Sequence, residues 1–326
     1  MGFVLILKPH ICKNGVMMGI LLCGRVIIPS LLPFTACLLF IMNSNSLSDL
    51  KASHPKLGIF LVILLSFTGG YPIGAKLLNS AVKDDYISPQ NAGKMLCFCV
   101  NAGPAFIISA VGGLVLNSKK LGLILALAHI FSGFLLMLLS LKDIKTPGKR
   151  KKFSRLNLAD NFVKSVADAS SAVISICSFV ILFSAVNAYI NHFSQSFGLI
   201  KNLGLFLEVT NAVSQTKNIY LIAFLLGFGG ISVWCQVISV SKGVKFEFLR
   251  FLIFRILHGL LSVVLVKLIL KLFPLEISVF SNFKPTVIST FYSTASVGIS
   301  LLVMSVVFLT SITTKKYVGK ILEDVI

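Results

Sequence analysis

Two apolar stretches of the chain are interrupted by the same kind of residues, and such interruptions can form a ligand site inside a membrane. In each, an aliphatic run ends in a Gly-Gly pair, and a long polar side chain follows at the same offset. A bilayer cannot pair freed backbone groups, so a break survives only where it lines a cavity or is covered by protein. Paired breaks in corresponding halves indicate a transporter's binding site. The candidate residues are Gly69, Gly70, Tyr71, Pro72, Gly74 and Lys76 in one stretch and Gly229, Gly230, Ser232 and Gln236 in the other.

The first interruption is predicted to unwind its helix. Glycine weakens a helix, and Pro72 has no N–H to donate to the carbonyl of Thr68. Freed carbonyls suit a cation or the hydrogen-bond donors of a solute, whereas N–H groups near Gly74 suit an anion. The alternative is a kink that serves only helix packing. Lys76 follows the interruption and either points into a cavity or extends its ammonium to the lipid headgroups.

A different interruption occurs in the apolar segment 93–116. Pro104 frees the carbonyl of Val100, and Asn101 has both a donor and an acceptor. We expect Asn101 and Pro104 to line a cavity, with a kinked packing helix as the alternative.

An acidic residue, Glu208, follows the apolar run 203–207. A carboxylate in or near hydrocarbon is costly, so it is a functional candidate. Burial would raise the pKa of this carboxyl and suit it to carry a proton. Glu208 and Asn211 are therefore predicted to contribute to the site and to bind a coupling proton or cation. The alternative places Glu208 at the membrane interface, in an extracytoplasmic loop.

The other polar residues in apolar segments are expected to be structural. Arg255 and His258 share a helical face by their i, i+3 spacing. Arg250 and Arg255 are assigned to the cytoplasmic rim, and His258 and His129 to packed helix surfaces. The cysteines match no zinc or disulfide spacing, and the chain has no P-loop, zinc-protease or nucleophile-elbow motif. We therefore expect no catalytic residue, no metal and no cofactor, and we predict that the protein is not an enzyme.

The composition is that of a polytopic membrane protein. Mean hydropathy is +0.93, and only 13% of residues are charged, against roughly a quarter in soluble domains. We predict an all-α polytopic membrane protein of about eight transmembrane or re-entrant segments with broken helices. Its two repeated halves would be residues 1–141 and 161–326, joined by a basic cytoplasmic linker, 142–160. Whether the segment 197–213 crosses or re-enters decides whether the halves are inverted or parallel, and both readings stay open.

The charge distribution predicts the topology. A net charge of +19 would indicate nucleic acid for a soluble protein. Here the basic residues cluster in short loops between apolar runs, which is the positive-inside pattern. The linker and both termini are therefore assigned to the cytoplasm, and no nucleic-acid partner is expected. The predicted partners are the lipid bilayer and an unidentified small solute, and homo-oligomerisation is left open. The short apolar run at the N-terminus lacks the form of a cleaved signal peptide.

Taken in order, these motifs resemble the YlbJ family of sporulation integral membrane proteins. The resemblance covers nearly the whole chain, except that the family usually has a complete first helix where this chain has a short stretch before Lys8. It implies the Gate, or nucleoside-recognition, module, which is shared in outline with concentrative nucleoside transporters and ferrous-iron transport proteins. It also implies a role in endospore formation, around cortex assembly, in a Gram-positive spore former. The matching stretches are Gly69 to Lys76, Asn101 to Phe106, Glu208 to Asn211, Gly229 to Val233 with Gln236, and Arg255 to Gly259.

The leading hypothesis is a transporter-like protein of the cell membrane that moves or gates a small solute. Its site would lie where the two broken segments meet, with Asn101 and Glu208 nearby. The alternative is a non-transporting membrane scaffold needed for spore cortex assembly.

Overall fold

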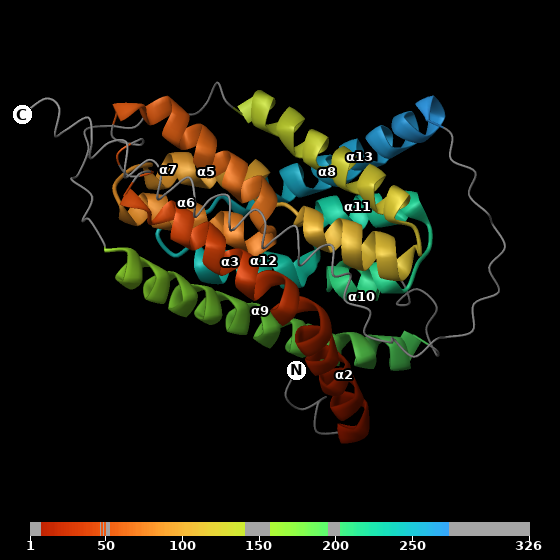
Figure 1. Cartoon of the computed structure of the whole chain (residues 1–326). Helices are drawn as coiled ribbons and strands as arrows, with labels where there is room; N and C mark the ends of the chain where they lie inside the picture. The colour runs from red at the N-terminus through yellow and green to blue at the C-terminus, as the bar shows by residue number, and fades with distance from the viewer. Residues whose placement is uncertain are drawn as a thin grey trace, which may run out of the picture. The chain divides into compact units, whose positions relative to one another are not determined.

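The structure is a computed structural model of the chain that describes residues 8–45, 47, 49, 53–140, 157–194 and 203–273. Every regular element in these residues is helical, and they contain no β-strand (Figure 1). The all-α part of the fold prediction is therefore confirmed. The predicted last segment, 291–312, and most of the basic linker lie outside the described residues.

Five helical stretches among the described residues are long and apolar enough to cross a membrane. Large apolar side chains on them remain exposed; Phe131 is 54% and Ile174 66% exposed. Such surfaces suit contact with lipid tails, as expected of an integral membrane protein. The five stretches are Pro9–Ile27, Lys119–Ser140, Leu158–Phe193, Ile219–Val240 and Phe248–Leu272.

The N-terminal helix packs along the longest helix of the structure. Helix α2 (Pro9–Leu22) continues through a π-helical turn, η1 (Cys23–Ile27), into α3 (Ile28–Met42). Both α2 and α3 contact α9 (Leu158–Ser194), the long green helix of Figure 1. A Cβ placed at Gly19 would lie 2.7 Å from the Cα of Ile181. Glycine therefore allows the two helix backbones to approach closely.

Helix α9 is longer than the apolar segment 172–190 predicted from the sequence. Its N-terminal part is polar, but Asn161, Ser165 and Ala169 are buried at a spacing of four. These residues place one face of the polar part against the rest of the protein. Hydropathy alone misses such a helical extension.

Three segments each consist of two helices separated by a non-helical joint. The first joins α5 (Pro55–Gly69) and α6 (Tyr71–Lys83) at Gly70. In the second, residues 100–103 lie between α7 (Pro89–Cys99) and a helical turn at Pro104 that continues as the π-helix η2 (Phe106–Val115). The third joins α11 (Ile219–Phe228) and α12 (Gly230–Val240) at Gly229. The predicted interruptions therefore all occur in the structure.

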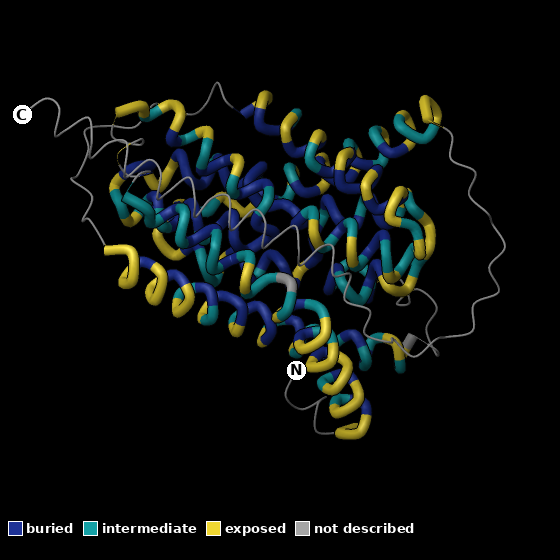
Figure 2. The backbone as a smooth tube through the Cα atoms, in the orientation of Figure 1, coloured by how far each residue is buried: buried dark blue, intermediate teal, exposed yellow. Residues whose placement is uncertain are grey.

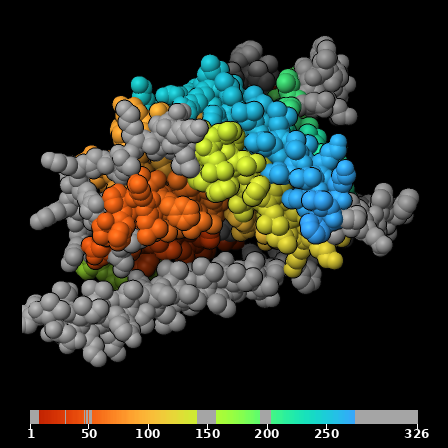
Figure 3. All heavy atoms as spheres, turned by 90° about the horizontal axis from the view of Figure 1, so that it is seen from above, coloured from red at the N-terminus to blue at the C-terminus, as the bar shows by residue number. Residues whose placement is uncertain are grey.

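The remaining elements complete the bundle. Helix α8 (Lys119–Ser140) lies between α5 and α13 (Phe248–Leu272), as Figures 1 and 3 show. Between α9 and α11 the structure describes a 3₁₀ turn, η5 (Leu203–Phe206), and α10 (Val209–Ser214). Neither is long enough to cross a membrane.

The broken segments form the core of the protein. Most of α6 and α7 is buried (Figure 2). Helix α6 also contacts α12, so parts of two broken segments pack together. Gly74 makes the contact between α6 and α7 possible, because a Cβ there would collide with the carbonyl oxygen of Cys99.

Candidate functional site

The two Gly-Gly interruptions lie against each other. Tyr71, the first residue of α6, donates a hydrogen bond of 2.7 Å from its hydroxyl to the carbonyl of Leu226 near the end of α11. A Cβ at Gly229 would lie 3.4 Å from Cε1 of Tyr71. Gly70 has φ +90° and Gly229 φ +82°, a region that strains other L-residues. The motif therefore supplies both the joints and the contact between them.

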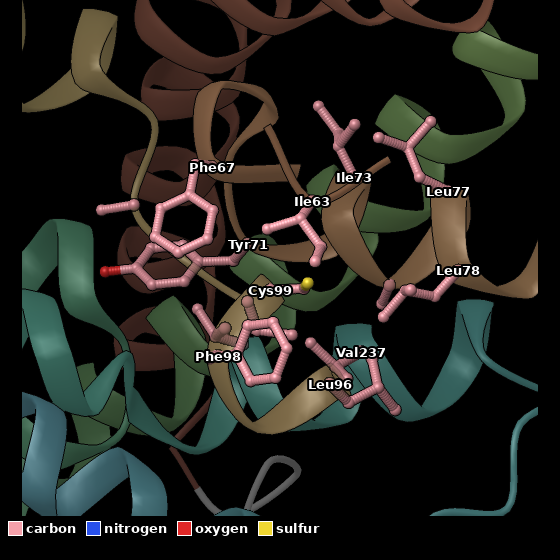
Figure 4. Close-up of a cluster of buried hydrophobic side chains, with 14 of the residues drawn as sticks. Ile63, Phe67, Tyr71, Ile73, Leu77, Leu78, Leu96, Phe98, Cys99 and Val237 are labelled. Atoms are coloured by element: carbon pink, nitrogen blue, oxygen red, sulfur yellow. The ribbon is translucent and has the colours of Figure 1, made fainter. Parts of the chain in front are cut away.

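The third joint meets the first one. A Cβ at Gly103 would lie 3.5 Å from the Cα of Gly70 and 3.7 Å from the carbonyl oxygen of Thr68. Figure 4 shows Tyr71 in one cluster with Phe67 of α5 and Phe98 of α7. Three breaks that are distant in the sequence thus converge in one buried region.

The end of α11 is fully capped by protein groups. The last four carbonyls of a helix lack intrahelical partners, but here each accepts a hydrogen bond. Besides the Tyr71 bond to Leu226, Trp234 Nε1 donates to Phe228 at 3.0 Å and an Arg255 nitrogen to Gly227 at 3.5 Å. The N–H of Gly229 donates to Leu225 at 2.8 Å.

Arg255, on α13, caps the end of α7 as well. It donates to the carbonyl of Cys97 at 2.6 Å and to that of Val100, and its guanidinium lies over the Phe251 ring. The side chain is fully buried among the helices, whereas a residue of the cytoplasmic rim would be expected to reach water. The physical reason is the negative end of the α7 dipole, which compensates the buried charge. The carbonyl that Pro104 frees at Val100 is therefore held by the protein.

Asn101 belongs to a buried polar cluster between α7, α8 and α13. Its side-chain amide donates to Phe98 at 2.8 Å, and the adjacent N–H of Ala102 donates to Nε2 of His129 at 2.9 Å. Nε2 of His258 bonds to the carbonyl of His129 at 3.0 Å, and the two rings stack with centroids 4.3 Å apart. Both histidines are packed inside the bundle, as predicted. Oδ1 of Asn101 and Nδ1 of each histidine have no hydrogen-bond partner among the described residues.

The end of α5 differs from the other two helix ends. No described residue donates a hydrogen bond to the carbonyls of Phe67, Thr68 or Gly69. Lys76, the cation nearest in sequence, instead donates from Nζ to the backbone carbonyl of Asp168 on α9. The Lys76 ammonium is thus held by a neighbouring helix.

Glu208 is buried and caps α10. Its carboxylate accepts hydrogen bonds from the N–H groups of Thr210 at 3.0 Å and Asn211 at 2.7 Å. The Asn211 side chain in turn donates to Ser184 Oγ on α9 at 3.0 Å. Burial raises the pKa of the Glu208 carboxyl, although the N–H bonds oppose the shift. Glu208 is 1% exposed, so it is buried within the protein, unlike the interfacial loop residue of the alternative.

Ser232 and Gln236 occupy a different environment from Lys76. The N–H of Ser232 donates to the carbonyl of Leu207 at 2.8 Å, which attaches the turn before α10 to the start of α12. Gln236 Nε2 donates to Ser232 Oγ at 3.2 Å within α12. The matching offset of Lys76 and Gln236 in the sequence therefore does not give them equivalent contacts.

Sequence reasoning missed Arg255 and Trp234 as donors to the helix ends at the breaks. Arg255 carried one signal, a cation inside an apolar helix at i, i+3 from His258. Nothing in the sequence pattern linked it to the freed carbonyls of α7 and α11.

Comparison with known proteins identifies a relative. The chain is similar to the sporulation integral membrane protein YlbJ of Bacillus subtilis (strain 168), with 26% identity over 267 residues. The match covers 67% of this chain and 65% of that protein, slightly less than two thirds of its length. No family model and no solved structure matches the chain. The resemblance to the YlbJ family of integral membrane proteins, predicted from the ordered motifs, is therefore confirmed.

Proposed function

We propose that the chain is a transporter-like membrane protein that moves or gates a small solute where its three broken segments converge. The observation that carries the proposal is the contact of the two Gly-Gly breaks, through the hydrogen bond of Tyr71 to Leu226 and the packing of Tyr71 on Gly229. Broken helices that meet at membrane depth are the usual construction of a transporter site.

Buried polar groups around the breaks support a ligand-binding role. Asn101 has an unpartnered Oδ1, and the carbonyls at the end of α5 lack donors among the described residues. Buried polar groups are normally paired with protein, water or ligand. In this proposal the solute and a coupling proton or cation contact these groups, and Glu208 is the candidate proton carrier.

The similarity to YlbJ supports a role in sporulation, and we infer that this role concerns the spore cortex. We place the protein in the cell membrane with both termini in the cytoplasm, because the basic residues concentrate in the linker and near the C-terminus. About eight segments in two repeated halves remain our proposal for the complete chain, with the α5/α6 and α11/α12 breaks as the corresponding positions.

Uptake by proteoliposomes tests the transport proposal. The purified chain should accumulate at least one member of a broad set of labelled metabolites above the level of empty liposomes. Uptake should fall strongly in Gly70→Leu, Asn101→Ala and Glu208→Gln. Leu127→Ala is the matched control, because Leu127 is exposed on α8. A preparation that is folded and moves no solute would count against the proposal.

Complementation of sporulation separates the transporter from the scaffold. In a spore former that lacks its own relative, the three break variants should fail to restore spores although they reach wild-type membrane levels. A scaffold predicts the reverse, with full function in these variants and losses at exposed surfaces such as Leu127 and Phe131. Full activity of all three variants would refute the transporter proposal.

A further inference from the structure

The end of α5 carries backbone acceptors that the described protein groups leave unused. The carbonyls of Phe67, Thr68 and Gly69 have no donor among those residues, and both Phe67 and Gly69 are buried. A helix C-terminus also has partial negative charge. An electropositive ligand would therefore stabilise this helix end.

A buried hydroxyl lies on the face of α3 that packs against the same joint. Leu31 Cδ2 and Leu38 Cδ1 lie 3.9 Å and 2.9 Å from Cβ positions built at Gly70 and Gly69. Thr35 is four residues after Leu31 and three before Leu38, so all three share one face of the helix. Thr35 is fully buried, and its Oγ1 has no hydrogen-bond partner among the described residues.

Thr35 differs from other buried or half-buried helical hydroxyls nearby. Ser66 donates to the carbonyl of Val62 at 2.7 Å, and Thr68 donates to that of Leu65 at 3.0 Å. Such bonds to the preceding turn are the ordinary way to satisfy Ser and Thr in a helix. Because Thr35 makes none, its hydroxyl oxygen is available to a ligand at the joint.

The chemistry of the available oxygen atoms indicates which class of ligand would bind. All three oxygens, two from backbone carbonyls and one from a hydroxyl, are neutral and hard, which suits an alkali cation better than a thiophilic metal. The described residues contain no group of three or more His, Cys, Asp or Glu side chains that could hold a metal ion. Lys76 does not occupy the joint, because its ammonium binds Asp168 on α9.

We propose that the end of α5 and Thr35 form a binding site for a monovalent alkali cation, with Na⁺ as the reference ion. The carbonyl oxygens of Thr68 and Gly69 and Oγ1 of Thr35 are its protein ligands, and water or solute oxygens complete the coordination. Use of the ion to drive transport rests on the proposed function, whereas binding of the ion is independent of it.

Thermal unfolding of the purified full chain in detergent tests the site. NaCl should raise the melting temperature in a saturable way relative to choline chloride at equal ionic strength, with LiCl and KCl as further probes. Thr35→Val should weaken the apparent Na⁺ affinity by about tenfold or more, and Thr35→Ser should retain it. Ser66→Ala is the matched control, because it removes a buried hydroxyl of α5 that is already bonded to the carbonyl of Val62 and is not among the proposed ligands.

A direct measurement of sodium binding to the wild-type chain tests the site even if the variants fail to fold. Radioactive sodium should bind to the wild-type chain and be displaced by unlabelled Na⁺ but not by choline. Absence of saturable binding, or full Na⁺ stabilisation of a folded Thr35→Val variant, overturns the site. Sodium binding without any solute uptake would refute the transport proposal and leave the cation site supported. Solute uptake without sodium binding would refute the cation site and leave the transport proposal supported.

Discussion

The two Gly-Gly breaks share a sequence pattern but differ in how their helix ends are satisfied. At the α11/α12 break, every one of the last four carbonyls accepts a hydrogen bond, and three of the donors are the side chains of Tyr71, Arg255 and Trp234. At the α5/α6 break, the last three carbonyls have no donor among the described residues. One break is closed by protein, and the other retains acceptors for a ligand. A glycine pair therefore determines where a helix breaks, whereas side chains elsewhere determine whether the break can bind anything.

Removal of the Arg255 side chain should have the largest effect on the closed break. Arg255→Met leaves the carbonyls of Cys97, Val100 and Gly227 without their side-chain donor. We expect a loss of roughly 3–5 kcal/mol in the free energy of unfolding, measured by thermal unfolding in detergent. Lys267→Met, which removes an exposed cation from the same helix, should change stability little. Equal stability of the two variants would show that the closed break does not depend on its caps.

Alanine and asparagine substitutions at the two joint glycines should distinguish their backbone conformations. Gly229 is in the left-handed helical region, which Asn tolerates, whereas Gly70 combines φ +90° with ψ +170°, a region almost restricted to glycine. Both alanine variants should lose about 1–3 kcal/mol of stability. Gly229→Asn should recover part of the loss, and Gly70→Asn should not. Equal recovery at both positions in the same thermal assay would contradict this distinction.

The sequence was sufficient to predict the breaks because their causes are local. Gly70, Gly229 and Pro104 act on their own helix turns, through positive φ or a missing N–H, and the structure has a joint at or next to each. The all-helical class can also be predicted, because hydropathy is a property of each segment's own residues. The length of α9 is not determined by local sequence alone. Its polar N-terminal part is helical and buries Asn161 and Ser165 against other elements.

The partners of the freed carbonyls could not be predicted, since they depend on which distant helices meet. Arg255 looks like a rim residue in its own segment, and only the approach of α7 and α11 makes its burial favourable. Thr35 has no distinguishing neighbours in the sequence and becomes notable only through Leu31 and Leu38, which contact the joint. Lys76 and Gln236 occupy the same offset and still make unrelated contacts.

The smallest expected effect concerns the hydrogen bond that links the two breaks. Tyr71→Phe keeps the ring packed against Gly229 and removes only the donor to Leu226. The buried carbonyl then lacks its partner, so the free energy of unfolding should fall by about 1 kcal/mol. Tyr220→Phe is the matched control, because Tyr220 lies in the first turn of α11, the helix that carries Leu226, and is exposed. The effect also discriminates between two ways of holding the breaks together. If packing of the aromatic ring is sufficient, Tyr71→Phe will match the control and Tyr71→Leu alone will be destabilised; if the capped carbonyl matters, Tyr71→Phe will already show the loss.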